Sequence, residues 1–287
     1  MYVHLPRKAV TRVTRFSTGA VDRAADLATW PLFLLKVVFY SIRDIVFRLK
    51  YAKTVALQVS DIVIGVGATV IGGGMVFVIF IMSLFLGTEV GLQVYTGLQV
   101  IGAESFMGLV GAFVNVREIT PVIAAVALAA QCGSAFTAEL GAMRISEEID
   151  ALEVMGINSF VYLVCTRVVA ALVALVPLYL IALFASFFAT RFISTQFFSL
   201  APGVYDYYFY LYLPMEDLIF STVKVAIFAF AVITIHCYHG YYASGGPVGV
   251  GRAAGSAIRM SIVTIVTLNL LLSYVFWGQG GSVRLAG

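Results

Sequence analysis

Residues 62–86 contain no charged side chain and lie between Asp61 and Glu89. A helix of about 20 mostly apolar residues crosses the roughly 30 Å hydrocarbon core of a bilayer, so this run predicts a membrane-spanning helix. The composition supports the prediction, because 61% of the residues are apolar and 11% are charged, against about 25% charged in a soluble domain. The net charge of +3 does not indicate a nucleic-acid partner. We expect an all-α integral membrane protein.

Three later runs predict further spans, over residues 168–190, 218–239 and 260–277. The first contains no charge, and the second is interrupted by Lys224. The third ends in aromatic residues, which are enriched where a span meets the membrane interface.

The stretch 98–138 holds two apolar runs that are separated by Arg117 and Glu118. As one straight helix it would be about 60 Å long, twice the thickness of the hydrocarbon core. It therefore forms either two spans joined by a tight turn, or one span preceded by a kinked or partly immersed segment. This choice decides on which side of the membrane all later segments lie.

The basic residues favour a single crossing there. Ten of the eighteen Lys and Arg residues precede residue 60, which places the N-terminus in the cytoplasm. One crossing between 98 and 138 then leaves fourteen basic residues on the cytoplasmic side, whereas two crossings would move four of them, Arg144, Arg167, Arg252 and Arg259, to the outside. We expect five spans, with the N-terminus inside and the C-terminus outside.

The segment before the first span is basic and is expected to lie on the membrane. Residues 30–51 have a helical pattern in which the basic residues share one stripe, with members Lys36, Tyr40, Arg43, Phe47 and Lys50. A helix in the cytoplasmic interface explains this stripe, and a tilted extra span is the alternative. No short apolar run with a cleavage site follows the N-terminus, so no cleaved signal peptide is expected. We divide the chain into a basic cytoplasmic N-terminal segment, 1–53, and a membrane domain, 54–287.

Residues 138–158 connect two spans on the cytoplasmic side and are too short to cross the membrane. They predict an amphipathic helix over 146–155, capped by Ser146 and ended by Gly156 in a left-handed conformation. Its apolar residues are Ile145, Ile149, Leu152 and Met155, and its acids are Glu147, Glu148, Asp150 and Glu153. An anionic leaflet would repel four acids. Docking on a partner protein is therefore favoured over a plain solvated connection.

Two motifs in this order resemble the MlaE/YrbE permease family. They are REITPVIAAVALAAQCGSAFTAELGAMRISEEIDALEVMGIN at 117–158 and GYYASGGPVGVGRAAGSAIRMS at 240–261. The resemblance extends from about residue 30 onward, and the polybasic N-terminus is more similar to the actinobacterial YrbE branch. It implies an interfacial N-terminal helix, five spans, and a coupling helix over 146–155 that sits on a cytoplasmic ATPase.

The resemblance also implies the assembly and its location. The chain would be a permease subunit of an ATP-driven lipid transporter in the bacterial cell membrane, moving a lipid or fatty acid between the membrane and a conduit of Mce-domain proteins. Its partners would be a cytoplasmic ABC ATPase dimer and a second permease subunit, either a paralogue or the same chain. The chain contains no G-x-x-x-x-G-K-[ST] motif, so ATP and Mg²⁺ would be bound by the ATPase, and no cofactor is expected here.

Four charged residues fall at membrane depth: Glu104, Arg117, Glu118 and Lys224. Ionised groups there are costly and are usually paired. Arg117 and Glu118 are adjacent and point about 100° apart on a helix, so each is expected to pair with another group, and Lys224 could pair with Glu118 or Glu104. A structural network and a gating role both stay open. A proton-coupled secondary carrier that uses Glu104 and Glu118 is the alternative function. Glu118→Ala is expected to impair transport or assembly.

The remaining candidates carry weaker predictions. Gly133, Thr137 and Gly141 recur four residues apart and predict close helix packing, within one subunit, at a dimer seam or around a lipid-sized cavity. His236 and His239 flank Cys237, which permits metal binding, although an interfacial position is favoured. With three histidines in the chain, a membrane-embedded lipid-modifying enzyme is disfavoured. The run GGPVGVG at 245–251 is expected to form a tight cytoplasmic turn.

Overall fold

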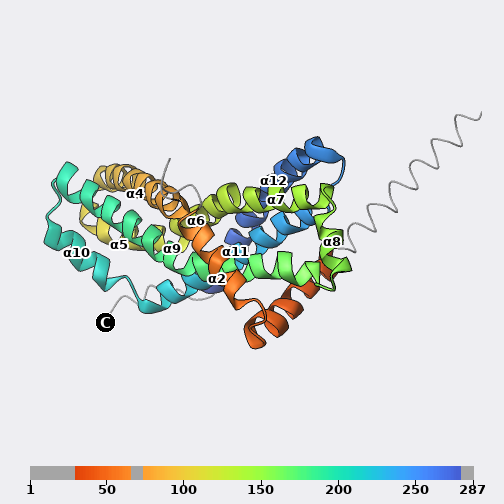
Figure 1. Ribbon diagram of the computed structural model, residues 1–287. Coiled ribbons are helices and arrows are strands. Elements are labelled where there is room, and N and C mark those ends of the chain that lie inside the picture. The colour runs from red at the N-terminus through yellow and green to blue at the C-terminus, as the bar shows by residue number, and fades with distance from the viewer. Residues whose placement is uncertain (1–29, 66–73, 279–287) are drawn as a thin grey trace, which may run out of the picture.

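The computed structural model describes residues 30–65 and 74–278, and every regular element in those ranges is a helix (Figure 1). Five helical segments are long and apolar enough to cross a membrane. They are Gly74–Val100, Glu104–Ile145, Phe160–Phe197, Met215–Tyr241 and Gly246–Trp277. The prediction of an all-α membrane protein with five spans is confirmed.

The α-helices and short π- or 3₁₀-turns follow one another with few loops. In chain order they are η1 (Ser41–Phe47), α2 (Ala52–Val63), α4 (Gly74–Val100), η2 (Glu104–Phe106), α5 (Met107–Val114), η3 (Asn115–Ile119), α6 (Thr120–Leu128), η4 (Ala129–Gly133), α7 (Ser134–Ile145), α8 (Glu148–Val154), η5 (Phe160–Cys165), α9 (Thr166–Phe192), η6 (Ile193–Phe197), α10 (Pro202–Leu211), α11 (Met215–Tyr241) and α12 (Gly246–Trp277). We call the two ends of the bundle the α8 end and the α10 end, after the short helices that lie there (Figure 1).

The first span begins later than predicted. The run 62–86 does not form one helix, because α2 ends at Val63 and the span itself is α4, which continues past Glu89. Gly65 and Gly74 both have positive φ angles, +75° and +61°. A residue with such a φ angle interrupts a right-handed helix, so one continuous helix cannot run through these two positions. The helix α2 was not predicted. Gly67, Gly72 and Gly73 of the predicted span lie outside the described residues.

The ambiguous stretch 98–138 crosses once. From Glu104 to Ile145 the chain is one continuous helical segment, with single π-turns at η3 and η4. Its 42 residues span about 63 Å at 1.5 Å per residue, about twice the thickness of the hydrocarbon core. Of the two predicted arrangements, the one with a tight turn between two spans is wrong.

The N-terminal helix runs alongside the bundle at the α8 end. Residues 30–40 are helical and continue into η1, so the predicted helix 30–51 ends four residues early, at Phe47. Phe33 and Val37 are buried against the bundle, whereas Leu35 and Phe39 are exposed. This helix is not among the five candidate spans. The basic residues before position 30 lie outside the described residues.

The glycine-rich run 245–251 is not a loop. Gly245 (φ +89°) ends the turn, α12 begins at Gly246, and Pro247 occupies its first turn, where proline is well tolerated. The last span therefore starts fourteen residues before the predicted 260. The other two late spans are also longer than predicted, because the helical segments cover Phe160–Phe197 and Met215–Tyr241.

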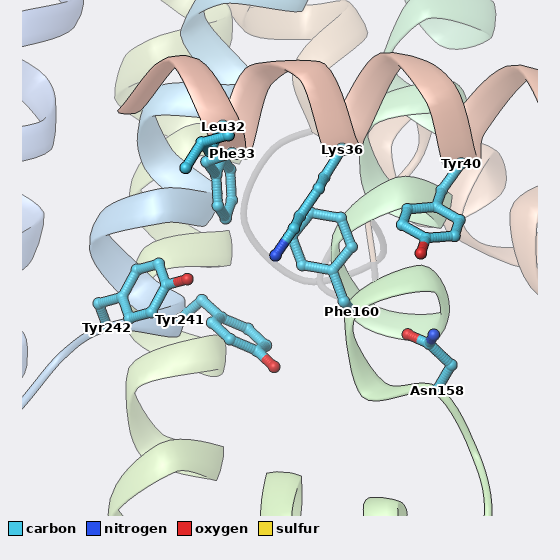
Figure 2. Close-up of a pocket in the computed structure, with 8 residues that line it drawn as sticks. All are labelled: Leu32, Phe33, Lys36, Tyr40, Asn158, Phe160, Tyr241 and Tyr242. Carbon is cyan, nitrogen blue, oxygen red and sulfur yellow. The ribbon is translucent and has the colours of Figure 1, made fainter. Parts of the chain in front are cut away.

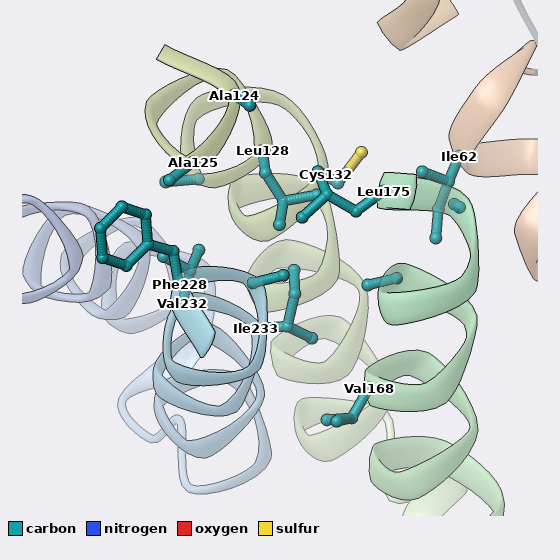
Figure 3. Packing of buried hydrophobic residues seen from close by; sticks show 14 of the residues in the cluster. Ile62, Ala124, Ala125, Leu128, Cys132, Val168, Leu175, Phe228, Val232 and Ile233 are labelled. Carbon is teal, nitrogen blue, oxygen red and sulfur yellow. The ribbon is translucent and has the colours of Figure 1, made fainter. Parts of the chain in front are cut away.

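Helix α9 forms the centre of the bundle and packs against α2, α4, α6 and α11. Leu175, Leu128 and Ile233 meet there from three different spans, and all are almost fully buried (Figure 3). Small residues allow the close approach. Gly133 and Gly141 contact the His236 ring and Val250, and the Thr137 hydroxyl lies 2.8 Å from His236 Nδ1. These three small residues thus pack within one chain, against α11 and the start of α12.

Gly87→Ala is expected to destabilise the contact between α4 and α9. A Cβ at position 87 would collide with the Ser186 carbonyl oxygen and lie 2.9 Å from the Ser186 Cα, so two backbones would have to move apart. We expect the melting temperature of the detergent-solubilised protein to fall by several degrees. Gly97→Ala in the same helix is the matched control, because nothing lies within 4 Å of its added Cβ. Equal melting temperatures for both variants would contradict the prediction.

Candidate functional site

A cluster of charged side chains joins three spans near the α10 end. Arg117 on η3 forms a salt bridge with Asp217 on α11, with Nη2 and Oδ2 2.7 Å apart. The Asp217 carboxylate also accepts a hydrogen bond of 2.8 Å from Trp277 Nε1 on α12. The Arg117 guanidinium lies over the ring of Phe113, 4.1 Å from its centroid. Because Asp217 is buried, these donors stabilise a carboxylate that water does not solvate.

Glu118 forms the second pair of the cluster. Its carboxylate accepts hydrogen bonds from Asn269 Nδ2 at 2.7 Å and Ser273 Oγ at 2.6 Å, both on α12. Lys224 Nζ on α11 lies 3.6 Å from Glu118 Oε2, and the Lys224 side chain is 0% exposed. Arg117 and Glu118 thus pair with separate residues, as expected for neighbours on a helix.

The local backbone explains why a lysine can be buried here. Pro121 has no N–H group, so the carbonyl of Arg117, four residues earlier, loses its usual helical donor. Lys224 Nζ donates to this carbonyl at 2.6 Å and to Ser273 Oγ at 2.7 Å. In a membrane span, a neighbouring helix has to satisfy a carbonyl freed by proline. The ammonium does this while it neutralises Glu118.

A cavity of about 340 Å³ opens beside the cluster and is lined by Arg117, Glu118, Ser273 and Trp277, among others. The Glu118 side chain is 45% exposed, which gives it access to this space. Glu104 does not belong to the cluster. It lies in η2, about 21 Å along the same helix from Glu118 at 1.5 Å per residue. Lys224 therefore pairs with Glu118 and not with Glu104.

Four members of the cluster were not predicted from the sequence. Asp217, Asn269, Ser273 and Trp277 were not predicted as partners, and Arg117 and Asp217 are 100 residues apart. One signal was available, because Asp217 is an acid at the start of an apolar run, where a charged group usually has a partner. Asn269 and Ser273 of α12 could not be singled out from the sequence, since an uncharged polar residue within a span is a common feature.

The second candidate site is α8, which differs from the predicted helix. It covers seven residues, Glu148–Val154, and not ten. Ser146 does not cap it, because Ser146 ends α7 and its hydroxyl donates to the carbonyl of Ala142. Glu147 has a left-handed conformation (φ +60°) and makes the turn between α7 and α8.

The end of α8 is as predicted. Gly156 has φ +76°. Its N–H donates to the Glu153 carbonyl, and the next N–H donates to the Leu152 carbonyl, at 2.9 and 3.0 Å. These two bonds form a Schellman motif, in which the left-handed residue is usually glycine.

One apolar residue anchors α8 to its own chain. Ile149 is 0% exposed and belongs to the main hydrophobic core, and Leu152 packs against that core. The prediction that both contact a partner is therefore wrong for Ile149. The exposed apolar residues are Ile145, Val154 and Met155.

The acids of α8 and of the turn before it are exposed. Glu147, Glu148, Asp150 and Glu153 are exposed, and Arg144 pairs with Asp150 at 2.9 Å. The helix thus presents a surface that is mainly acidic, with two exposed apolar side chains, Val154 and Met155, at its end.

The histidines near the α8 end have other contacts. His236 is buried between α7 and α11, where Thr137 occupies its Nδ1. His239 Nδ1 lies 2.9 Å from the Ile235 carbonyl oxygen. In the described part of the chain, no three His, Cys, Asp or Glu side chains gather as metal ligands would. Cys132, Cys165 and Cys237 are buried free thiols.

Comparison with known proteins identifies the family. The sequence model described as "Permease MlaE" matches residues 64–275, which include α8 and most of the charged cluster. The chain belongs to the MlaE permease family. A probable ABC transporter permease protein of Rickettsia bellii is 33% identical over 200 residues, which cover 70% of this chain and 77% of that protein.

More distant relatives include plant and cyanobacterial proteins. Protein TRIGALACTOSYLDIACYLGLYCEROL 1, chloroplastic, of Arabidopsis thaliana is 31% identical over 72% of this chain and 59% of its own length. A probable ABC transporter permease protein of Synechocystis is 29% identical over 75% of this chain and 82% of its own length. This MlaE-family chain is thus a permease component of an ABC transporter and a multi-pass membrane protein.

Proposed function

We propose that the chain is the permease subunit of an ATP-driven lipid transporter, and that α8 docks on the ATPase. The observation that carries this proposal is the construction of α8. A seven-residue helix is fixed to the core by Ile149, while its acids and the apolar Val154 and Met155 at its end are exposed. A rigidly attached, exposed acidic helix suits a partner with a basic groove, because complementary charges orient docking.

The proposed assembly follows the family. ATP and Mg²⁺ would bind to a separate cytoplasmic ABC ATPase dimer, and a second permease subunit, a paralogue or a second copy, would present a second α8. Mce-domain proteins would form the conduit outside the membrane. Lipid as the substrate class is supported by the Arabidopsis relative, which carries the name of a galactolipid.

The proposed orientation places the α8 end in the cytoplasm of a bacterial cell membrane, with the N-terminus inside and the C-terminus outside. The distribution of basic residues and the single crossing of the segment Glu104–Ile145 support it. The helix 30–47 would then lie in the inner interface, and the charged cluster would lie toward the outer side.

A proton-coupled secondary carrier receives less support. Its two proposed carboxylates, Glu104 and Glu118, lie about 21 Å apart along one helix, which is too far for direct proton transfer. Glu118 is moreover held by two hydrogen-bond donors, Asn269 and Ser273, and by the Lys224 ammonium 3.6 Å away.

Purification from native membranes tests the proposal. We expect the tagged chain, extracted in mild detergent, to co-purify with a nucleotide-binding subunit, and the complex to hydrolyse ATP. Transport of a labelled lipid by the reconstituted complex should require hydrolysable ATP. Lipid transport by the chain alone, driven by a proton gradient, would refute the proposal.

A further inference from the structure

A partly polar pocket lies under the N-terminal helix at the α8 end. Its volume is about 310 Å³, and its walls come from helix 30–47, the segment after α8, and the end of α11 (Figure 2). The side chains that line it include Lys36, Tyr40, Asn158, Phe160, Tyr241 and Tyr242. Neither the charged cluster nor the acidic surface of α8 includes this pocket.

The pocket has the charge of an anion site. In Figure 2 the Lys36 ammonium reaches down from the helix toward Phe160 and Tyr241, and the Tyr40 hydroxyl points toward the Asn158 amide. No carboxylate is among the lining residues. Within the described ranges Lys36 forms no ion pair, because Asp44, the acid on the same helix, is bound by Arg43 and Arg48. The Tyr242 hydroxyl, like that of an ordinary tyrosine, is protonated at pH 7 and can act as a neutral donor.

An apolar groove continues from the same helix. It has a volume of about 470 Å³ and is lined by Ile45, Leu49, Val55, Val59 and Val173, with other small side chains. Ile45 follows Tyr40 by five residues. In the π-helical segment η1 this spacing is about one turn, so the two side chains lie on the same side of the helix. The lining residues of the pocket and of the groove therefore follow one stripe of the helix.

We propose that the pocket binds the phosphate-containing headgroup of an anionic phospholipid and that the groove holds one of its acyl chains. Lys36 supplies the cation, and Tyr40, Asn158 and Tyr242 supply hydrogen-bond donors. A lipid fits better than a free phosphate for two reasons. The same helix exposes the apolar residues Leu32, Leu35 and Phe39, and the apolar groove would bind an acyl chain but offers no favourable contact to a soluble anion. The inference does not depend on the proposed transport function.

The pocket is connected to α8 by hydrogen bonds. The Ser159 hydroxyl lies 3.0 Å from the Tyr241 hydroxyl in the pocket wall and donates to Glu153 Oε1 on α8 at 2.7 Å. A lipid that orders Tyr241 and Asn158 would therefore also stabilise the segment that positions α8.

Lipid titration with native mass spectrometry tests the site. Phosphatidylglycerol is added to the purified protein in mild detergent, together with any subunits that co-purify. We expect the wild-type protein to retain it and Lys36→Gln to bind it about tenfold more weakly, since a charge-assisted hydrogen bond is lost. Lys53→Gln is the matched control, because Lys53 is exposed on α2 and does not line the pocket. Phosphatidylcholine should bind more weakly, and millimolar inorganic phosphate should not displace phosphatidylglycerol.

Three results would overturn the proposal. Unchanged binding by Lys36→Gln would show that the pocket does not hold the headgroup. An equal loss for Lys53→Gln would show general attraction to a basic surface. Displacement by inorganic phosphate would assign the pocket to a soluble anion. Filling the groove with a larger side chain is an independent check. Ala56 lines the groove, so Ala56→Phe is expected to weaken binding of phosphatidylglycerol, while the melting temperature stays within about 2 °C of the wild type.

Discussion

We expect Glu118→Ala to lower the melting temperature of the purified protein by about 4–8 °C and to reduce lipid transport. The substitution leaves the Lys224 ammonium fully buried with only two neutral acceptors, the Arg117 carbonyl and Ser273 Oγ. Removing one partner of a fully buried pair costs about 3–5 kcal/mol. Because Glu118 is 45% exposed, we expect a smaller cost, about 2 kcal/mol.

The double variant Glu118→Ala/Lys224→Met distinguishes two roles of Glu118, pairing with Lys224 and gating of transport. It removes both charges and leaves an apolar side chain of similar length, a replacement that is often neutral for stability. It also leaves the Arg117 carbonyl without a donor, so recovery of stability should be large but incomplete. If Glu118 serves only to pair Lys224, transport recovers with stability. If Glu118 acts in gating, the double variant is stable and inactive.

Two outcomes would contradict the prediction for the cluster. A melting temperature of Glu118→Ala equal to that of the wild type would show that Lys224 is solvated or neutral. Additive losses in the double variant would show that the two residues do not interact, since coupled neighbours give non-additive effects.

Charge reversal on α8 is expected to abolish ATPase binding without unfolding the chain. Both acids in Glu147→Lys/Glu148→Lys are exposed, so the melting temperature should change by less than about 2 °C. Reversed charges would meet the basic groove of the proposed partner, and like charges at an interface cost several kcal/mol. We expect at least a tenfold loss of co-purified ATPase and of nucleotide hydrolysis.

Two further variants make this test specific. Glu216→Lys reverses an exposed charge at the α10 end and should leave ATPase binding unchanged, because that end faces away from the proposed partner. Ile149→Ala removes the buried anchor of α8 and should lower stability by about 2–4 kcal/mol as well as ATPase binding. Full retention of the ATPase by Glu147→Lys/Glu148→Lys would refute α8 as the docking helix.

The predictions from sequence were most accurate where one local property decides the structure. Five spans, and a single crossing of 98–138, followed from apolar length and from the distribution of basic residues. The left-handed Gly156 followed from the intrinsic freedom of glycine. The predictions failed where one local sequence pattern is compatible with two different structures. Ser146 suits the start of a helix or the end of one, and α7 continues far enough to use it as an end.

The sequence by itself therefore determined that this chain is a five-span helical membrane protein with a short acidic segment between two spans, because hydropathy and helix termination depend on neighbouring residues. Only the tertiary structure decided that Arg117 pairs with Asp217, that Lys224 caps the carbonyl freed by Pro121, and that Ile149 faces inward. The first two contacts join residues that are 100 and 107 positions apart in the sequence. Their partners are chosen by the rotation and depth of packed helices, which no single segment specifies.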